Sequence, residues 1–253
     1  MSGHSKWATT KHQKAITDAK RAKNFTKLLK EITVAAKMGD PNPDFNPRLR
    51  SAIIAAKAAS MPKANIENAI KKATAGGAGE NWDEIRYEGY GPSGVAFIVE
   101  ALTDNKNRTA SCVRSIFTKC GGALGETGSV GFMFERVGLI GFEGNVAKEE
   151  EMFESAIDAG ADNIESNSEW HEITTSIENF TKVRDALMNK YGEPKEAKIC
   201  WIAKDPIAID DFEKAETLNK LTEMLEDNED VQNVYSNSEF TDEVLEKLDQ
   251  NQE

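Results

Sequence analysis

The chain of 253 residues has few residues that could cross-link it or hold a metal ion. Its three cysteines, Cys112, Cys120 and Cys200, form an odd set without a C-x-x-C pair. We therefore expect no disulfide framework and a reducing compartment, the cytoplasm. Three histidines are too few for a histidine-rich metal site, so neither a metal nor another cofactor is expected.

Long apolar segments are also missing. The longest apolar runs, such as Val95–Val99, are far too short to cross a bilayer, which excludes a membrane protein. No apolar segment follows Met1, so we expect no secretory signal, and the Lys-rich residues 1–30 contain a single Arg, which argues against a cleaved transit peptide. The composition is that of a globular protein of two or three domains.

Positive charge is scarce overall and concentrated at one end. The net charge is −12, yet residues 1–80 contain 15 Lys and Arg against 6 Asp and Glu. Residues 81–253 contain 16 basic residues against 37 acidic ones. The first part should therefore attract polyanions and the second should be repelled by them.

The basic part has the helical periodicity of a small bundle. In residues 24–38 the apolar side chains follow the i, i+3, i+4 pattern, and the lysines from Lys20 to Lys37 lie on the opposite side of the helical wheel. Asn46–Pro47 predicts the start of a second helix, and Pro62 that of a third, which ends at Gly76–Gly77. Residues 1–79 are thus predicted to form a basic helical domain.

We expect this domain to bind nucleic acid. The candidate contact residues are Lys6, Trp7, Lys11, Lys14, Lys20, Arg21, Lys23, Lys27 and Lys30. The cations would contact phosphates, and Trp7 would either stack on a base or pin the N-terminal arm to the bundle. The alternative, a merely solvated lysine face, is disfavoured by the basic excess over the whole segment.

The acidic remainder predicts two mixed domains. After a linker at residues 76–84, residues 94–102, 107–120 and 130–136 predict a strand, a helix and a strand. Residues 137–203 give the order β-α-β-β-α-β, whose first helix, 148–159, should turn Met152, Phe153 and Ile157 inward. A helix at 211–225 and a strand at 231–236 would complete the sheet begun at residue 94.

The predicted fold class is therefore α+β, an N-terminal three-helix bundle followed by two α/β domains of split-βαβ, or ferredoxin-like, type. The middle domain comprises residues 80–136 and 205–240, and residues 137–204 are inserted into it. Residues 241–253 form an acidic tail that should fray. We expect the helical domain to be separately compact, with few apolar contacts to the rest of the chain.

Nothing in the sequence indicates catalysis. His171 is predicted to be a packed or exposed strand residue rather than a base, and no nucleophile has a recognisable partner. The glycine-rich residues 121–131 lack the spacing and the lysine of a phosphate-binding loop, which favours a structural role over phosphate binding. We expect a protein that is not an enzyme.

Several segments closely resemble the YebC family. They are GHSKW at 3–7, AKRAKNFTKLLKEITVAAK at 19–37, DFNPRLRSAIIAAKAASMP at 44–62, YEGYGPSGVAFIVEALTDNKNRT at 87–109, GGALGETGSVGFMFER at 121–136 and the ending VQNVYSN. Met38–Gly39 stands where the family usually has a glycine pair, and Ser60 where it often has Asn. The resemblance implies three domains, the last inserted into the second, and a regulator of gene expression without known enzymatic activity.

The resemblance leaves the nucleic acid open. Family members are labelled transcriptional regulatory proteins, which implies DNA, but the family also includes a mitochondrial translational activator. That relative implies a translation factor that binds ribosomal RNA and relieves stalling, for example at proline runs. Residues 1–80 contain 12 Lys and 3 Arg and no base-reading motif, which favours structured RNA on physical grounds. A protein-interaction scaffold is the third hypothesis. The expected partners are DNA or ribosomal RNA and possibly the ribosome, bound by a monomer.

Overall fold

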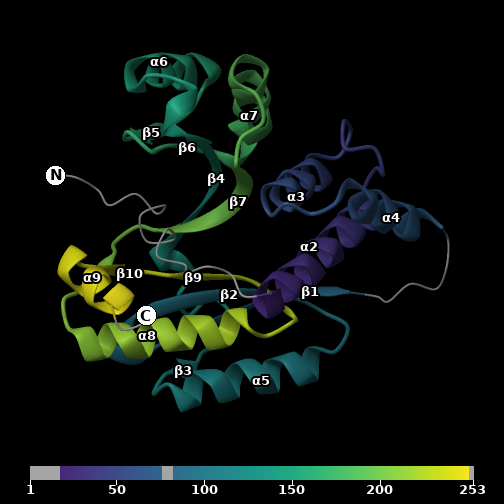
Figure 1. The fold of residues 1–253 in the computed structure, drawn as a ribbon. Coiled ribbons are helices and arrows are strands. Elements are labelled where there is room, and N and C mark those ends of the chain that lie inside the picture. Colours follow the sequence, from purple (N-terminus) through teal and green to yellow (C-terminus); the bar gives the residue numbers. More distant parts are fainter. Residues whose placement is uncertain (1–17, 76–81, 251–253) are drawn as a thin grey trace. The chain divides into compact units, whose positions relative to one another are not determined.

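The computed structural model describes residues 18–75 and 82–250 (Figure 1). Within them the chain forms two compact units. Unit 1 contains residues 24–75 and 136–200, and unit 2 contains residues 18–23, 82–135 and 201–250. No helix among the described residues is long and apolar enough to cross a membrane.

The first part of unit 1 is helical, as the sequence predicted. Its helices are α2 (Asp18–Met38), of which residues 24–38 belong to this unit, α3 (Pro47–Ala58) and α4 (Lys63–Thr74). Asn46 caps α3 with its side-chain oxygen, which accepts from the Leu49 amide at 3.0 Å, and its Nδ2 donates to the Ala35 and Asp40 carbonyls. Buried Ile32, Ala36, Leu49 and Ile66 belong to the apolar core of these helices.

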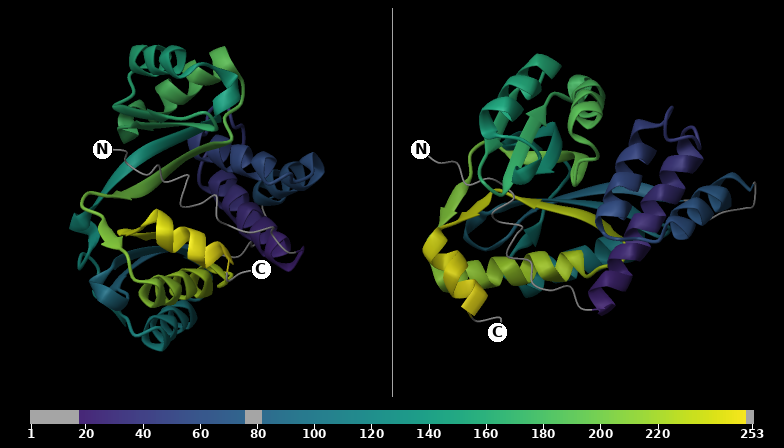
Figure 2. Two further views of the ribbon diagram at one scale, coloured as in Figure 1. Left: turned by 60° about the vertical axis from the view of Figure 1, so that its left-hand side comes forward. Right: turned by 45° about the horizontal axis from the view of Figure 1, so that its top comes forward.

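The second part of unit 1 is the predicted ferredoxin-like insertion. Its elements are β4 (Phe134–Glu143), α6 (Glu149–Ala159), β5 (Asn163–Ser166), β6 (Trp170–Thr175), α7 (Ile177–Tyr191) and β7 (Glu196–Ala203). The sheet order is β5-β6-β4-β7, and β6 runs antiparallel to both β4 and β5. Helices α6 and α7 lie on one face of this sheet (Figures 1 and 2), where Ile140, Phe142 and Ile173 form the core with Met152 and Val183.

Two expectations for this region are wrong. The strand predicted at 130–136 is not a separate element, because a short 3-10 turn, η2 (Gly131–Met133), leads into the continuous strand β4. On α6 only Met152 of the three predicted inward residues is buried, whereas Phe153 is 54% and Ile157 44% exposed. The small residues Ala156 and Ala159 complete the buried face of α6 instead.

The expectation of few apolar contacts from the helical segment is also wrong. Ile54 of α3 is 2% exposed and belongs to the apolar core of the insertion. Arg184 of α7 is fully buried, with its Nη1 3.4 Å from the Pro47 carbonyl oxygen and from Ser51 Oγ. The apolar pattern of α3 does not reveal this contact, because Ile54 and its neighbour Ile53 serve two different cores.

Unit 2 is built on a second antiparallel sheet. Its strands are β1 (Asp83–Tyr90), β2 (Ala96–Thr103), β3 (Ala123–Leu124) and β9 (Val231–Ser236), in the order β3-β1-β2-β9. Helices α5 (Lys106–Lys119) and α8 (Phe212–Glu226) cover one face of the sheet (Figures 1 and 2). Phe97 and Val99 of β2 pack there against Phe117, Leu218 and Leu221. The sequence did not predict β1, which begins inside the expected linker.

Residues 238–250 do not form the fraying tail that we expected, and residues 251–253 lie outside the described residues. Strand β10 (Ser238–Phe240) pairs in parallel with β8 (Ile207–Ile209), and α9 (Asp242–Gln250) follows it. Val244 is 1% and Leu248 9% exposed, and both belong to the core of unit 2. The acidic composition hid this apolar face, on which Val244, Leu245 and Leu248 are buried.

Candidate nucleic-acid interface

The basic face of α2 follows from the spacing of its cations. Lys20, Lys23, Lys27 and Lys30 are separated by three, four and three residues, which places them on one side of a helix. The apolar side of the same helix is buried from Ile32 onward. The helix therefore has one side fixed by packing and one side that carries positive charge.

The structure describes only part of the predicted contact set. Lys6, Trp7, Lys11 and Lys14 lie outside the described residues, and of Lys20 only the backbone is described. Arg21 is exposed, whereas Lys23, Lys27 and Lys30 are each partly buried. The prediction that these residues contact nucleic acid stays a prediction.

Some of these cations already have partners within the chain. The Lys23 ammonium lies 3.3 Å from the Asp227 carboxylate, and Arg21, Lys27 and Lys30 also have interaction partners. A phosphate would have to compete with such contacts at each position. Because Lys23 is 42% exposed, its pair with Asp227 is the kind of surface ion pair that contributes at most about 1 kcal/mol. An incoming phosphate could therefore displace the Asp227 carboxylate.

The arginines of α3 make ion pairs and hydrogen bonds that stabilise the fold. The Arg48 guanidinium makes a bidentate contact with the Glu31 carboxylate, at 2.6 and 3.0 Å. Arg50 donates to Asp185 at 2.8 Å and to the carbonyl oxygens of Pro43 and Asp44. These geometries hold the loop before α3 and join α3 to α7, so the basic excess counted from sequence overstates the charge available to a ligand.

Helix α4 supplies two cations that the sequence reasoning did not select. Lys71 and Lys72 are exposed in its last turn, and their ammonium groups have no ion pair or hydrogen bond within residues 18–75 and 82–250. Their favourable interaction with the helix C-terminus explains their position in part. Their only sequence signal is the adjacent pair itself, at the end of the third amphipathic helix.

The glycine-rich segment has its backbone donors occupied by a side chain of the chain itself. The buried carboxylate of Glu88 accepts the amides of Val130 and Gly131 through Oε2, at 2.9 and 2.8 Å. Its Oε1 lies 3.0 Å from the Arg86 guanidinium. A phosphate-binding loop must offer these N–H groups to a ligand, so the contacts of Glu88 favour the structural role.

These contacts also fix the charge state of Glu88. Burial alone would raise the pKa of its carboxyl group. The hydrogen bonds from the backbone of Val130, Gly128 and Gly131 and the positive charge of Arg86 outweigh this effect and lower the pKa below its ordinary value of 4.5. Glu88 is thus an ionised anchor for the segment that follows β3.

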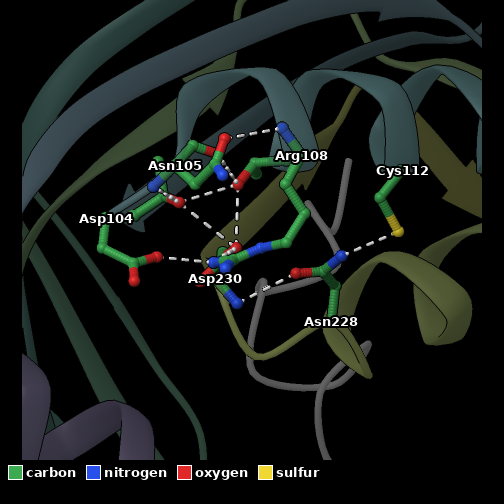
Figure 3. Close-up of polar contacts among 8 residues, drawn as sticks. Asp104, Asn105, Arg108, Cys112, Asn228 and Asp230 are labelled. Carbon is green, nitrogen blue, oxygen red and sulfur yellow. Dashed lines mark hydrogen bonds and ion pairs between the residues drawn. The ribbon is translucent and has the colours of Figure 1, made fainter.

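The segment LTDNKNRT at 102–109 forms a network of polar side-chain contacts within unit 2 (Figure 3). Asp230 Oδ2 accepts from Arg108 Nη2 and Thr109 Oγ1, each at 2.8 Å, and Thr103 Oγ1 lies 3.3 Å away. Asp104 also accepts from Arg108, and the hydrogen bonds to Asp230 and Asp104 raise the pKa of the guanidinium. This network of polar contacts joins the end of β2, the start of α5 and the turn before β9.

The remaining reactive side chains serve the fold. His171 is fully buried, with Nδ1 2.7 Å from Ser166 Oγ and Nε2 3.1 Å from the Ala147 carbonyl oxygen. This confirms that His171 is a packed strand residue. Cys112 and Cys120 lie along the core side of α5 as free thiols, and Cys200 is buried. Within the described ranges, no three or more His, Cys, Asp and Glu are placed to hold a metal ion.

Comparisons with known proteins cover nearly the whole chain. A family model described as the TACO1/YebC protein N-terminal domain matches residues 5–76, and one described as the TACO1/YebC second and third domain matches residues 82–238. The chain is also similar to the crystal structure of a conserved hypothetical protein from Aquifex aeolicus, at 46% identity and a TM-score of 0.85. That match covers 95% of this chain and 99% of the other. The family matches support a role like that of a transcriptional regulator.

Proposed function

The chain belongs to the TACO1/YebC family, and from this premise we propose that it is a non-catalytic, nucleic-acid-binding regulator of gene expression that binds through the basic side of α2. The supporting observation is the opposition of two faces on one helix, an apolar face buried from Ile32 onward and a face with cations at helical spacing. Lys71 and Lys72 extend the positive surface available in the helical segment.

The test is charge reversal on this face. The quadruple variant Lys20→Glu, Lys23→Glu, Lys27→Glu and Lys30→Glu should lose nucleic-acid binding and keep its helix content. A matched control reverses four lysines elsewhere, Lys106, Lys119, Lys148 and Lys204, all of them exposed in the structure. Normal binding by the α2 variant, or an equal loss in the control, would refute the proposal.

The same assay yields the number of phosphates contacted. If about four to six phosphates are neutralised, the logarithm of the affinity should fall with the logarithm of salt concentration with a slope of about −3 to −5. An affinity that does not depend on salt would exclude binding through phosphate contacts.

The proposal has two versions, a DNA-binding transcriptional regulator and a translation factor that binds ribosomal RNA. One observation favours RNA, because the described candidate face contains three lysines and one arginine, and lysine suits phosphate contact better than bidentate base reading. Folded RNA adds shape and 2′-hydroxyl contacts to the phosphate attraction.

A competition experiment separates the two versions. A labelled large ribosomal subunit bound to the protein is challenged at physiological salt with an excess of random DNA and, separately, of promoter DNA. Retention of the ribosomal complex against both competitors supports the translation factor. Displacement by a promoter but not by random DNA supports the transcriptional regulator.

A further inference from the structure

The outer face of α6 exposes apolar side chains beside a hollow. Phe153 is 54% exposed, and Ile157 follows it by one helical turn on the same side, at 44%. An open hollow of about 460 Å³ lies next to them, lined by Glu149, Glu150, Phe153, Glu154, Ile164 and Ser166. Phe153 therefore forms part of a concave surface together with Ile164 of β5.

The core of the insertion does not need these side chains. Met152 and Ala156 are fully buried, and they already fill the contact between α6 and the sheet. The apolar residues of α6 recur at helical spacing, which would ordinarily place Phe153 and Ile157 in the core as well. Large apolar side chains that lie together on a surface mark interaction sites. Strand β5, beside the hollow, is an edge strand of its sheet.

The rim of the hollow carries uncompensated negative charge. Residues 148–166 contain seven Asp and Glu and one lysine. Glu151 pairs with Lys190 at 3.4 Å. The other helix carboxylates, Glu149, Glu150, Glu154 and Asp158, have no ion pair within the described part of the chain.

Helix stabilisation explains only some of these carboxylates. Glu149 and Glu150 lie in the first turn, where negative charge is favoured by the helix dipole. Glu154 and Asp158 lie beyond that turn, where the helix dipole no longer stabilises a negative charge. The combination of exposed apolar side chains and unpaired carboxylates is complementary to a ligand with the opposite charge and a similar apolar face.

We propose that this acidic apolar surface, made by α6 and β5, docks a basic segment of a partner protein. An apolar side chain of the segment occupies the hollow beside Phe153 and Ile164, and its lysines or arginines meet the glutamates of the rim. Nucleic acid does not fit, because its phosphates would face the three carboxylates that line the hollow, Glu149, Glu150 and Glu154. This surface is separate in sequence from the basic side of α2 and does not depend on the proposed function.

The test uses the full-length protein and a defined probe, a fluorescein-labelled amphipathic peptide of leucine and lysine. Fluorescence anisotropy should detect binding that weakens with salt, and hydrogen exchange should show protection in residues 149–166. The double variant Phe153→Ser and Ile157→Ser should weaken binding about tenfold or more, because it removes the apolar contact. A peptide of leucine and glutamate should not bind.

Matched variants show whether the site, and not general charge, is responsible. Neutralising Glu149, Glu150 and Glu154 to Gln should weaken binding, whereas the same change at Glu213, Glu216 and Glu223, three exposed positions of α8, should not. Phe132→Ser removes another exposed aromatic side chain, 66% exposed, and should leave the affinity unchanged. Phe153→Leu should retain most of the binding.

Four results would overturn the proposal. They are equal weakening by the α8 variant, protection outside residues 149–166, protection of this region by an RNA or DNA oligonucleotide, and a dimer in sedimentation that Phe153→Ser dissolves. The last result would identify a second copy of the chain as the occupant. Failure of the α2 charge reversal to affect nucleic-acid binding would refute the proposed function without changing any of these measurements.

Discussion

Replacing Glu88 by Gln should release the glycine-rich segment between β3 and β4. The carboxylate is 1% exposed, and through Oε2 it accepts two backbone amides at 2.8 and 2.9 Å. A hydrogen bond to a charged group contributes about 1.5–3 kcal/mol and one to a neutral group about 0.5–1.5 kcal/mol, so the carbonyl oxygen of Gln can still accept both amides but each hydrogen bond is weaker by about 1 kcal/mol. The substitution should therefore lower the free energy of unfolding by about 3 kcal/mol, counting the lost contact with Arg86.

The effect of Glu88 should depend on pH in a definite direction. Its pKa is lowered in the folded protein, so its ionised form stabilises the fold above the unfolded pKa, near the ordinary value of 4.5. This contribution is lost as the pH falls from about 4.5 through the folded pKa. The difference in stability between the protein and Glu88→Gln should thus be constant near neutral pH and shrink below about pH 4.5.

Two measurements test this reasoning. Urea unfolding from pH 7 to pH 3 gives the difference in stability, and hydrogen exchange reports directly on the amides of Val130 and Gly131, which should lose protection. The control is Glu126→Gln, an exposed residue of the same segment whose carboxylate has no hydrogen bond or ion pair among the described residues. A stability difference that stays the same from pH 7 to pH 3, or unchanged exchange at Val130 and Gly131, would refute the assignment of Glu88 as an ionised anchor.

Four further substitutions test the other structural assignments by urea unfolding. Asp230→Asn should lower the free energy of unfolding by about 2 kcal/mol, because it weakens the hydrogen bonds with Arg108 and Thr109. Asp205→Asn, an exposed control, should not change it measurably. Ile54→Ala should cost about 2–5 kcal/mol by leaving a cavity in the core of the insertion, far more than Ile199→Ala at a 37% exposed site. Val244→Ala should cost about 1–2 kcal/mol if α9 belongs to the core of unit 2, with Glu246→Ala as its exposed control. Ser60, at φ 61° after α3, donates its amide to Lys57 in a Schellman motif, so Ser60→Asn should stabilise by about 0.5–1 kcal/mol.

The sequence was sufficient to predict those elements that have one buried face and one solvated face. Helices α2, α3, α4, α5, α7 and α8 and the order of the insertion were predicted on this basis. Strand β1 was missed because its sequence DEIRYEGY mixes charges with apolar residues, since one of its faces carries the buried Glu88 and the partly exposed Arg86. Helix α9 was missed because its acidic composition outweighed three apolar positions.

Parts of the candidate site could not be read from the sequence for a different reason. The sequence does not show which carboxylate a cation will pair with. The pairs of Arg48 with Glu31 and of Arg50 with Asp185 join residues that are 17 and 135 positions apart. Likewise, the inward prediction for Phe153 assumed that every apolar side chain of α6 serves its own core. Both errors concern contacts that only the tertiary structure defines.

The internal ion pairs change what the basic excess means for binding. Arg48, Arg50 and Lys57 are each within 2.8 Å of a carboxylate of unit 1, and in each case the pair stabilises the fold around α3. Those cations would release few counterions when a nucleic acid arrives, because their charge is already neutralised. If binding depended on the total charge of residues 1–80, an excess of nine would give a salt slope near −8. About four to six phosphate contacts, made by Lys20, Lys23, Lys27, Lys30, Lys71 and Lys72, would instead give a slope of about −3 to −5. The measured slope therefore distinguishes a discrete basic face from a diffuse attraction to the whole helical segment.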